Sequence, residues 1–248
     1  MSATLLEHEA HVWQVSPESI RDSAVLADFR AVLSDEERKQ CDRFHFPEDG
    51  HRYLVSHAML RHVLSGYTGL APTDLRFSRS AHGRPEIDNS EVPGIRFNLT
   101  HTHGLAACIV SRSNDCGIDA EKLDSRHNMT GIAQRMFSAE ECHQLEPLRG
   151  AELSEAFFSR WVLREAFVKA KGIGISYPTR KLHFDIRDDN TIRVGFDPDL
   201  GEDDSDWQFR LLRPTGEHIT AIALRRNRPA DFRVVQHAFK RWPDSRSW

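Results

Sequence analysis

Two kinds of apolar spacing alternate along this chain, and their order limits the possible folds more than any other feature. Apolar residues recur at three- and four-residue intervals over residues 53–67 and 153–171, which is typical of helices with one buried face. Residues 95–100 and 105–111 instead follow the short apolar patterns of strands. The sequence therefore predicts an α+β protein, in which helices and antiparallel strands alternate in two halves.

Helix-end signals support these segments. Ser34 and Ser138 each begin an S-x-x-E pattern that ends at Glu37 and Glu141. This pattern is a capping box, which satisfies free backbone donors at the start of a helix. Gly172 follows the long second helical segment and predicts its C-terminal end.

Short alternating or apolar runs predict the remaining strands. They cover residues 75–77, 116–121, 182–185, 191–196, 207–212 and 220–224. The polar turn near residues 112–116 predicts a boundary between an N-terminal half, residues 1–112, and a C-terminal half, residues 113–248. The segment from Arg225 onward, with its spread charges and few apolar residues, is predicted to be a surface extension, and the sequence leaves open whether it is ordered.

Charge and composition exclude several classes of protein. The net charge of −4, from 33 basic and 37 acidic side chains, gives no reason to expect binding to nucleic acid. No apolar run is long enough to cross a bilayer and the N-terminus has no signal-peptide pattern, so we expect a cytoplasmic protein that does not bind membranes. We expect free thiols at the four cysteines, which are Cys41, Cys108, Cys116 and Cys142.

Asp119 and Glu121 form a candidate cation site on a predicted strand. Two residues apart, their side chains leave the same face and can converge on one divalent ion. The alternative is a solvated strand end before Lys122, because such acidic pairs are common on protein surfaces.

A second candidate feature lies on the helix predicted over residues 153–171. Trp161, Glu165 and Lys169 are four residues apart, which stacks them on one helical face. Glu165 and Lys169 could form a surface ion pair worth only about 0.3–0.5 kcal/mol. The aromatic ring of Trp161 favours partial burial of this face, and a buried carboxylate needs a partner such as a metal ion.

Three segments resemble, in order, motifs of Sfp-type phosphopantetheinyl transferases of the larger, pseudo-dimeric class. Residues 97–102 (FNLTHT), 117–122 (GIDAEK) and 161–169 (WVLREAFVK) are similar to the patterns F-N-x-[ST]-H, G-[IV]-D-x-E and W-x-x-[KR]-E-[AS]-x-x-K. The likeness covers roughly residues 30 to 185. It implies two similar α+β halves related by a pseudo-twofold axis, with antiparallel sheets and packed helices.

The resemblance also implies roles for individual residues. The carboxylates of Asp119, Glu121 and Glu165 are expected to hold Mg²⁺ against the pyrophosphate of coenzyme A. His101 is expected to contact a phosphate, and Thr100 stands beside it at the rim of the site. A structural hydrogen bond is the alternative for His101.

The nucleophile is expected to be a serine of a carrier protein. Glu141 and Glu165 are candidates for the base that accepts its proton, and Lys169 is placed to steady a phosphate or a carboxylate. The alternative for Glu141 is structural, because the capping box already uses its side chain.

Coenzyme A needs several cations for its phosphates. The available basic residues are Arg38, Lys39, Arg43, Arg52 and Arg84. Arg84 matches a family position that contacts the adenine nucleotide, Arg52 matches a basic residue of the family on a helix, and both are expected to bind coenzyme A. Glu37 and Gln40 stand where some relatives have lysines directed at the 3′-phosphate. We therefore expect either that Arg38 or Lys39 binds this phosphate instead, or that the 3′-phosphate is bound more weakly. A solvated helical face is the alternative for the cluster around Arg43.

The resemblance implies transfer of phosphopantetheine from coenzyme A to an apo acyl or peptidyl carrier protein by a monomer. A Mg²⁺-dependent phosphate-ester or pyrophosphate hydrolase is one alternative interpretation, and a non-catalytic module that binds carrier proteins or coenzyme A is another. Motif spacing does not distinguish carriers of fatty acid, polyketide or nonribosomal peptide synthesis.

Overall fold

The computed structural model describes residues 6–92, 94–124, 128–174, 177–187, 191–226 and 230–240. The chain divides into two compact units. The first unit contains Met1–Ala81, Pro85–Ser113 and Phe232–Trp248, and the second contains His82–Arg84 and Asn114–Asp231.

The first unit places a long helix against a mixed sheet. In chain order its elements are β1 (Glu9–Val15), α1 (Ser23–Val32), α2 (Asp35–Asp42), α3 (Pro47–Thr68), β2 (Phe77–Arg79), β3 (Pro85–Ile87), β4 (Ile95–Thr102), β5 (Leu105–Arg112) and β11 (Arg233–Ala238). The sheet has the order β11-β1-β5-β4, and β2 and β3 form a separate hairpin. Side chains of α3, including Met59, Val63 and Leu64, pack into a core with Phe97 and Val110 of the sheet.

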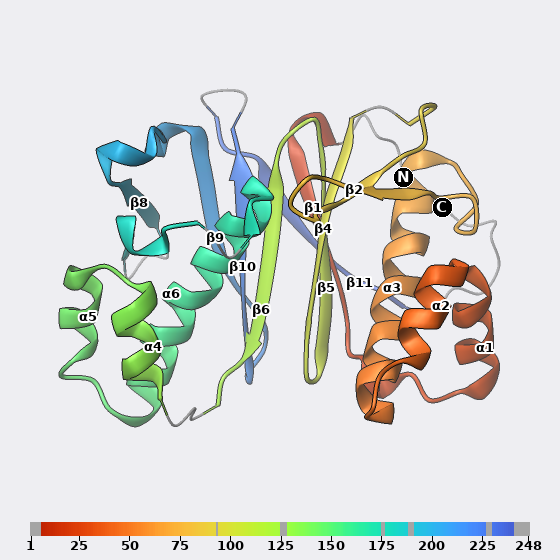
Figure 1. Ribbon diagram of the computed structural model, residues 1–248, viewed down its shortest axis with the longest axis horizontal. Coiled ribbons are helices and arrows are strands. Elements are labelled where there is room, and N and C mark those ends of the chain that lie inside the picture. Colours follow the sequence, from red (N-terminus) through yellow and green to blue (C-terminus); the bar gives the residue numbers. More distant parts are fainter. Residues whose placement is uncertain are drawn as a thin grey trace. The chain divides into compact units, whose positions relative to one another are not determined.

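The second unit places another long helix, α6, against an antiparallel sheet (Figure 1). Its elements are β6 (Cys116–Lys122), α4 (Met129–Met136), α5 (Ala139–Leu145), α6 (Gly150–Lys171), β7 (Leu182–Ile186), β8 (Ile192–Phe196), β9 (Trp207–Thr215) and β10 (His218–Arg225). The sheet has the order β6-β10-β9, and β7 and β8 pair as a hairpin. Short 3₁₀ turns occur at Pro17–Ser19 in the first unit and at Thr179–Lys181, Pro198–Leu200 and Asp204–Asp206 in the second.

The two units repeat one order of elements. Each runs from a strand through three helices to a short hairpin and then to a longer hairpin. The third helix has 22 residues in both units. The first strand pairs in both with the last strand of the longer hairpin, giving the matching orders β1-β5-β4 and β6-β10-β9. The expectation of two similar α+β halves is therefore confirmed.

The helix-end signals also correspond to real helix ends. Both capping boxes are present, at Ser34 with Glu37 and at Ser138 with Glu141. Gly172 ends α6 in the left-handed conformation, with a φ of 66°. Boundaries inferred from periodicity alone are less accurate, since α3 already begins at Pro47.

The segment after Arg225 corrects the sequence prediction of a surface extension. Its strand β11 pairs in parallel with β1, with Arg233 opposite Glu9. Arg233 Nε donates to Glu9 Oε1 at 3.0 Å, and the ring of Phe239 is 5 % exposed within the core of the first unit. The part of this segment from Phe232 onward therefore belongs to the first unit, whereas the predicted boundaries placed it in the C-terminal half; residues 241–248 lie outside the described residues.

Within the described ranges, no helix combines the length and the apolar character needed to cross a bilayer.

Candidate functional site

The site in the second unit begins with a close approach between α6 and β6. A Cβ atom at Gly117 would lie 2.0 Å from the backbone oxygen of Ala166 and 2.5 Å from the backbone nitrogen of Ala170. Only glycine leaves room for the helix backbone at this distance, and the two alanines are the small residues on the helix side. The sequence thus brings one edge of α6 directly against β6.

Asp119 and Lys169 meet at this edge. Asp119 lies two residues after Gly117 on β6, so both residues face the same side of the strand. Lys169 Nζ of α6 donates to Asp119 Oδ1 at 2.6 Å and to the backbone oxygen of Ile118 at 3.2 Å. Asp119 is 7 % exposed, so the carboxylate of this ion pair is largely shielded from water, whereas the Lys169 side chain is 29 % exposed.

Glu165 lies one helical turn before Lys169 and is half-buried. Burial raises the pKa of the Glu165 carboxyl, the negative charge of Asp119 raises it further, and Lys169 acts in the opposite direction. Glu165 thus lies within electrostatic reach of both Asp119 and Lys169. A cation placed beside both carboxylates would relieve their repulsion.

The donor set fits Mg²⁺. Asp119 and Glu165 offer hard carboxylate oxygens, and Mg²⁺ commonly binds to one or two carboxylates together with water and substrate phosphates. Among the residues that the structure describes, no group of three or more His, Cys, Asp and Glu side chains is arranged as a metal site. Glu121 is half-buried two residues beyond Asp119 on β6, and its part in binding the ion stays a prediction.

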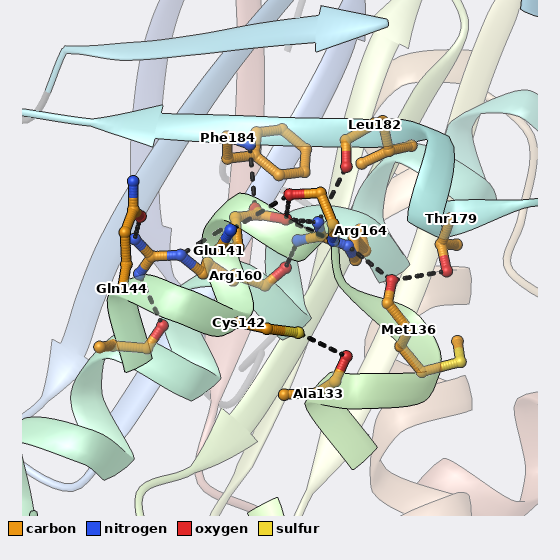
Figure 2. A network of polar contacts seen from close by, with 12 residues as sticks. Ala133, Met136, Glu141, Cys142, Gln144, Arg160, Arg164, Thr179, Leu182 and Phe184 are labelled. Carbon is orange, nitrogen blue, oxygen red and sulfur yellow. Dashed lines mark hydrogen bonds and ion pairs between the residues drawn. The ribbon is translucent and has the colours of Figure 1, made fainter. Parts of the chain in front are cut away.

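Glu141 lies in a different environment, a buried network between α5, α6 and β7 (Figure 2). Its Oε2 accepts hydrogen bonds from the backbone nitrogen of Ser138 at 3.0 Å and from the hydroxyl of Ser138 at 2.9 Å, and it forms an ion pair with Arg164. Its Oε1 accepts from the backbone nitrogen of Phe184 at 3.0 Å. Glu141 and Arg164 are both 1 % exposed.

The Glu141 network favours the ionised carboxylate. Burial alone would raise the pKa of Glu141, but the charge and hydrogen bond of Arg164 and the donors of Phe184 and Ser138 outweigh it and lower the pKa. A carboxylate that is enclosed and holds its proton weakly is a poor acceptor for a substrate proton. These contacts favour the structural alternative for Glu141 over the role of base.

Four other predicted residues lie in the first unit. Thr100 and His101 are adjacent on β4, where alternation buries Thr100 to 5 % exposure and leaves His101 exposed. Arg52 of α3 donates to Asp49 at 2.9 Å and lies 3.9 Å from Glu18. The exposed Arg43 is the C-terminal cap of α2.

Arg84 lies in the second unit, against the C-terminal end of α6. Its Nη1 donates to the backbone oxygen of Ala170 at 2.6 Å and lies 3.4 Å from Asp115. Its side chain also packs on Gly172, where a Cβ atom would lie 2.9 Å from Arg84 Cδ. Arg84 is only 8 % exposed, which is typical of a structural arginine, and its nucleotide contact stays a prediction.

Sequence reasoning missed the roles of two residues inside the recognised motifs. Gly117 precedes Asp119 and was given no role, although a glycine within a strand often marks a close backbone approach. Arg164 precedes Glu165, and only the depth of its burial reveals its structural role.

Comparison with known proteins matches both units to one family. Residues 115–223 match the 4′-phosphopantetheinyl transferase superfamily, and residues 19–114 match the family described as 4′-phosphopantetheinyl transferase, N-terminal.

Relatives from distant organisms agree. The 4′-phosphopantetheinyl transferase HetI of Nostoc sp. is 35 % identical over 70 % of this chain and 73 % of its own length. The 4′-phosphopantetheinyl transferase Sfp of Bacillus subtilis is 31 % identical over 67 % of this chain and 72 % of its own. The human L-aminoadipate-semialdehyde dehydrogenase-phosphopantetheinyl transferase is 24 % identical over 78 % and 67 %. This chain belongs to the 4′-phosphopantetheinyl transferase superfamily.

Proposed function

We propose that this enzyme moves the 4′-phosphopantetheine group of coenzyme A onto a serine of an apo acyl or peptidyl carrier protein. Adenosine 3′,5′-bisphosphate is the second product. The observation that carries the proposal is the Asp119–Lys169 ion pair, with Glu165 within electrostatic reach of both, in the unit that matches the transferase superfamily. The named relatives are transferases, which favours transfer over the hydrolase and the binding-module interpretations.

Asp119 and Glu165 would hold Mg²⁺, with Glu121 as a third candidate ligand. When bound, the ion would neutralise charge on the pyrophosphate of coenzyme A as the bond to the leaving group breaks. Lys169 already places a positive charge against Asp119, so it is suited to contact a phosphate next to the ion.

The transfer also needs an acceptor for the proton of the carrier serine. The serine oxygen forms a bond to the β-phosphorus, and the bond from that phosphorus to the oxygen of the nucleotide breaks. Glu165 is the better candidate base, because it is half-buried and its carboxyl is subject to the charges of Asp119 and Lys169, whereas Glu141 is enclosed by its own network.

Other features of the function rest on the family resemblance. Thr100, His101, Arg43, Arg52 and Arg84 are the proposed contacts of the coenzyme A phosphates. We further propose a monomer that acts in the cytoplasm and binds neither nucleic acid nor membranes. Whether the acceptor serves fatty acid, polyketide or nonribosomal peptide synthesis depends on surface contacts with the carrier.

Mass spectrometry of a panel of apo carrier proteins tests this function. Incubation with the enzyme, coenzyme A and Mg²⁺ should add one phosphopantetheine group to at least one carrier. Glu165→Gln should abolish the mass shift, whereas the matched substitution Glu140→Gln, at an exposed position on α5, should preserve it. Carriers of every class left unchanged by the wild-type enzyme would contradict the proposed transfer.

A further inference from the structure

We infer that Glu141 and Arg164 form a clasp that positions α6 for catalysis, and that Glu37 and Arg61 build the same clasp in the first unit. This inference concerns a positioning pair, and its effect on transfer rests on the proposed function.

The clasp of the second unit joins three elements. Glu141 caps the start of α5 together with Ser138 and pairs with Arg164 on α6. Arg164 donates from Nη2 to the backbone oxygen of Leu182 at 3.0 Å, and its guanidinium lies 5.4 Å from the ring centre of Phe184 on β7 (Figure 2). One ion pair thus ties α5, α6 and the β7–β8 hairpin together.

The first unit contains the corresponding capping box, ion pair, leucine backbone contact and phenylalanine ring contact at matching positions. Glu37 caps the start of α2 together with Ser34, and its Oε2 accepts from Arg61 Nε at 2.7 Å. Arg61 donates to the backbone oxygen of Leu75 at 3.0 Å, and its guanidinium lies 5.0 Å from the ring centre of Phe77 on β2.

The correspondence extends to the sequence spacing. Arg61 and Arg164 are each the fifteenth residue of a 22-residue helix. Each arginine donates to a leucine oxygen two residues before the phenylalanine under its guanidinium. Both arginines are buried, at 2 % and 1 % exposure. The two clasps are therefore one structural device present twice.

The first unit has the clasp but lacks the carboxylates at the positions that correspond to Glu165 and Asp119. His62 follows Arg61 on α3, where Glu165 follows Arg164 on α6. Trp13 of β1 pairs with the fourth residue of β5, as Asp119 of β6 pairs with the fourth residue of β10. The first unit thus keeps the clasp without the carboxylate pair, so the clasp serves the packing of the third helix.

In the second unit, the clasp has a consequence for the site because of its position on α6. Arg164 is adjacent to Glu165, and Lys169 lies little more than one turn further along the helix. Fixing the rotation of α6 at Arg164 therefore fixes the directions in which Glu165 and Lys169 leave the helix.

The matched variants Glu141→Gln and Glu37→Gln test this inference. Each should lower the Tm by about 10 °C, because each leaves a buried arginine without its charged partner. Hydrogen exchange should become faster in α6 for Glu141→Gln and in α3 for Glu37→Gln. Assayed below both Tm values, Glu141→Gln should lower kcat by about tenfold through misplaced groups on α6, and Glu37→Gln, in the unit without these groups, should lower kcat by much less.

Arg164→Lys provides a second test that keeps the charge but removes the planar fork of donors. It should reproduce the loss of kcat and the faster exchange in α6, with KM for coenzyme A and the shape of the kcat–pH profile unchanged. The inference would be overturned if Glu141→Gln lost one limb of the kcat–pH profile while its Tm and its hydrogen exchange in α6 stayed at the wild-type values. That outcome would identify Glu141 as the base, whose removal costs about 10²–10⁴-fold. Absence of transfer by the wild-type enzyme would instead refute the proposed function, while the Tm and exchange data would still test the clasp.

Discussion

Gly117→Ala perturbs the contact that assembles the site. The new methyl group would lie 2.0 Å from the backbone oxygen of Ala166, and ordinary contact begins near 3.4 Å, so α6 and β6 must separate by roughly 1.4 Å. Forcing a methyl group into a packed contact costs about 1–3 kcal/mol, which corresponds to a Tm lower by about 5 °C in a chain of this size.

The effect on transfer should exceed the effect on stability. A displacement of about 1 Å between catalytic groups can lower the rate by about 10²-fold, and Gly117→Ala moves Glu165 and Lys169 away from Asp119. The assay is the initial rate of phosphopantetheine transfer at a temperature where the variant is folded. Gly216→Ala is the matched control, because a Cβ atom there meets nothing within 4 Å. A wild-type rate and Tm in Gly117→Ala would refute the role assigned to this contact.

Four further predictions concern individual side chains. Glu165→Gln, measured in EDTA, should raise the Tm near neutral pH, because burial and Asp119 disfavour the ionised Glu165; a lower Tm would contradict this. Lys169→Met should slow transfer. In the absence of coenzyme A it should tighten Mn²⁺ binding, because Lys169 Nζ no longer competes with the ion for Asp119. Mn²⁺ titration curves identical to those of the wild type would argue against this competition. The pKa of Glu37 is lowered from 4.5 to about 2, so the ionised Glu37 stabilises the folded protein fully above pH 4.5, and this contribution is lost as the pH falls toward 2. Denaturant titrations should therefore show a smaller loss of folding stability in acid for Glu37→Gln than for the wild type. Phe239→Ala should cost about 3–5 kcal/mol in urea unfolding if β11 is anchored in the first unit, and a neutral result would contradict that anchoring.

Local sequence signals predicted the elements that depend on near neighbours. The capping boxes at Ser34 and Ser138 and the stop at Gly172 involve residues within one helical turn, so their spacing alone identifies them. The two-residue spacing of Asp119 and Glu121 placed both on one strand face for the same reason.

Nonlocal pairing explains what the sequence did not predict. The partner of β11 is β1, near the opposite end of the chain, and no periodicity within either segment reveals that they pair. Without its partner, β11 resembles a charged tail, because its Arg233 balances a glutamate that only the fold brings near.

Burial also favours one of the two roles that the sequence left open for Glu141. A glutamate at the third position of a capping box can face solvent or substrate, and only the fold encloses Glu141 with Arg164. Arg84, in a turn, matches a nucleotide contact by motif; the structure adds a hydrogen bond to the backbone oxygen of Ala170, and the nucleotide contact stays a prediction. Motifs identify residue types, whereas the packing around each residue determines its partners.

The central claim is that Asp119 and Glu165, from two different elements, hold the same divalent ion. Mn²⁺ binding measured by electron paramagnetic resonance in the presence of coenzyme A tests it most directly, for the wild type, Asp119→Asn, Glu165→Gln and the double variant. We predict that each single substitution weakens binding by roughly tenfold or more, and that the double variant departs from additivity because the two residues share one ion. Unchanged Mn²⁺ affinity in either single variant would contradict the claim.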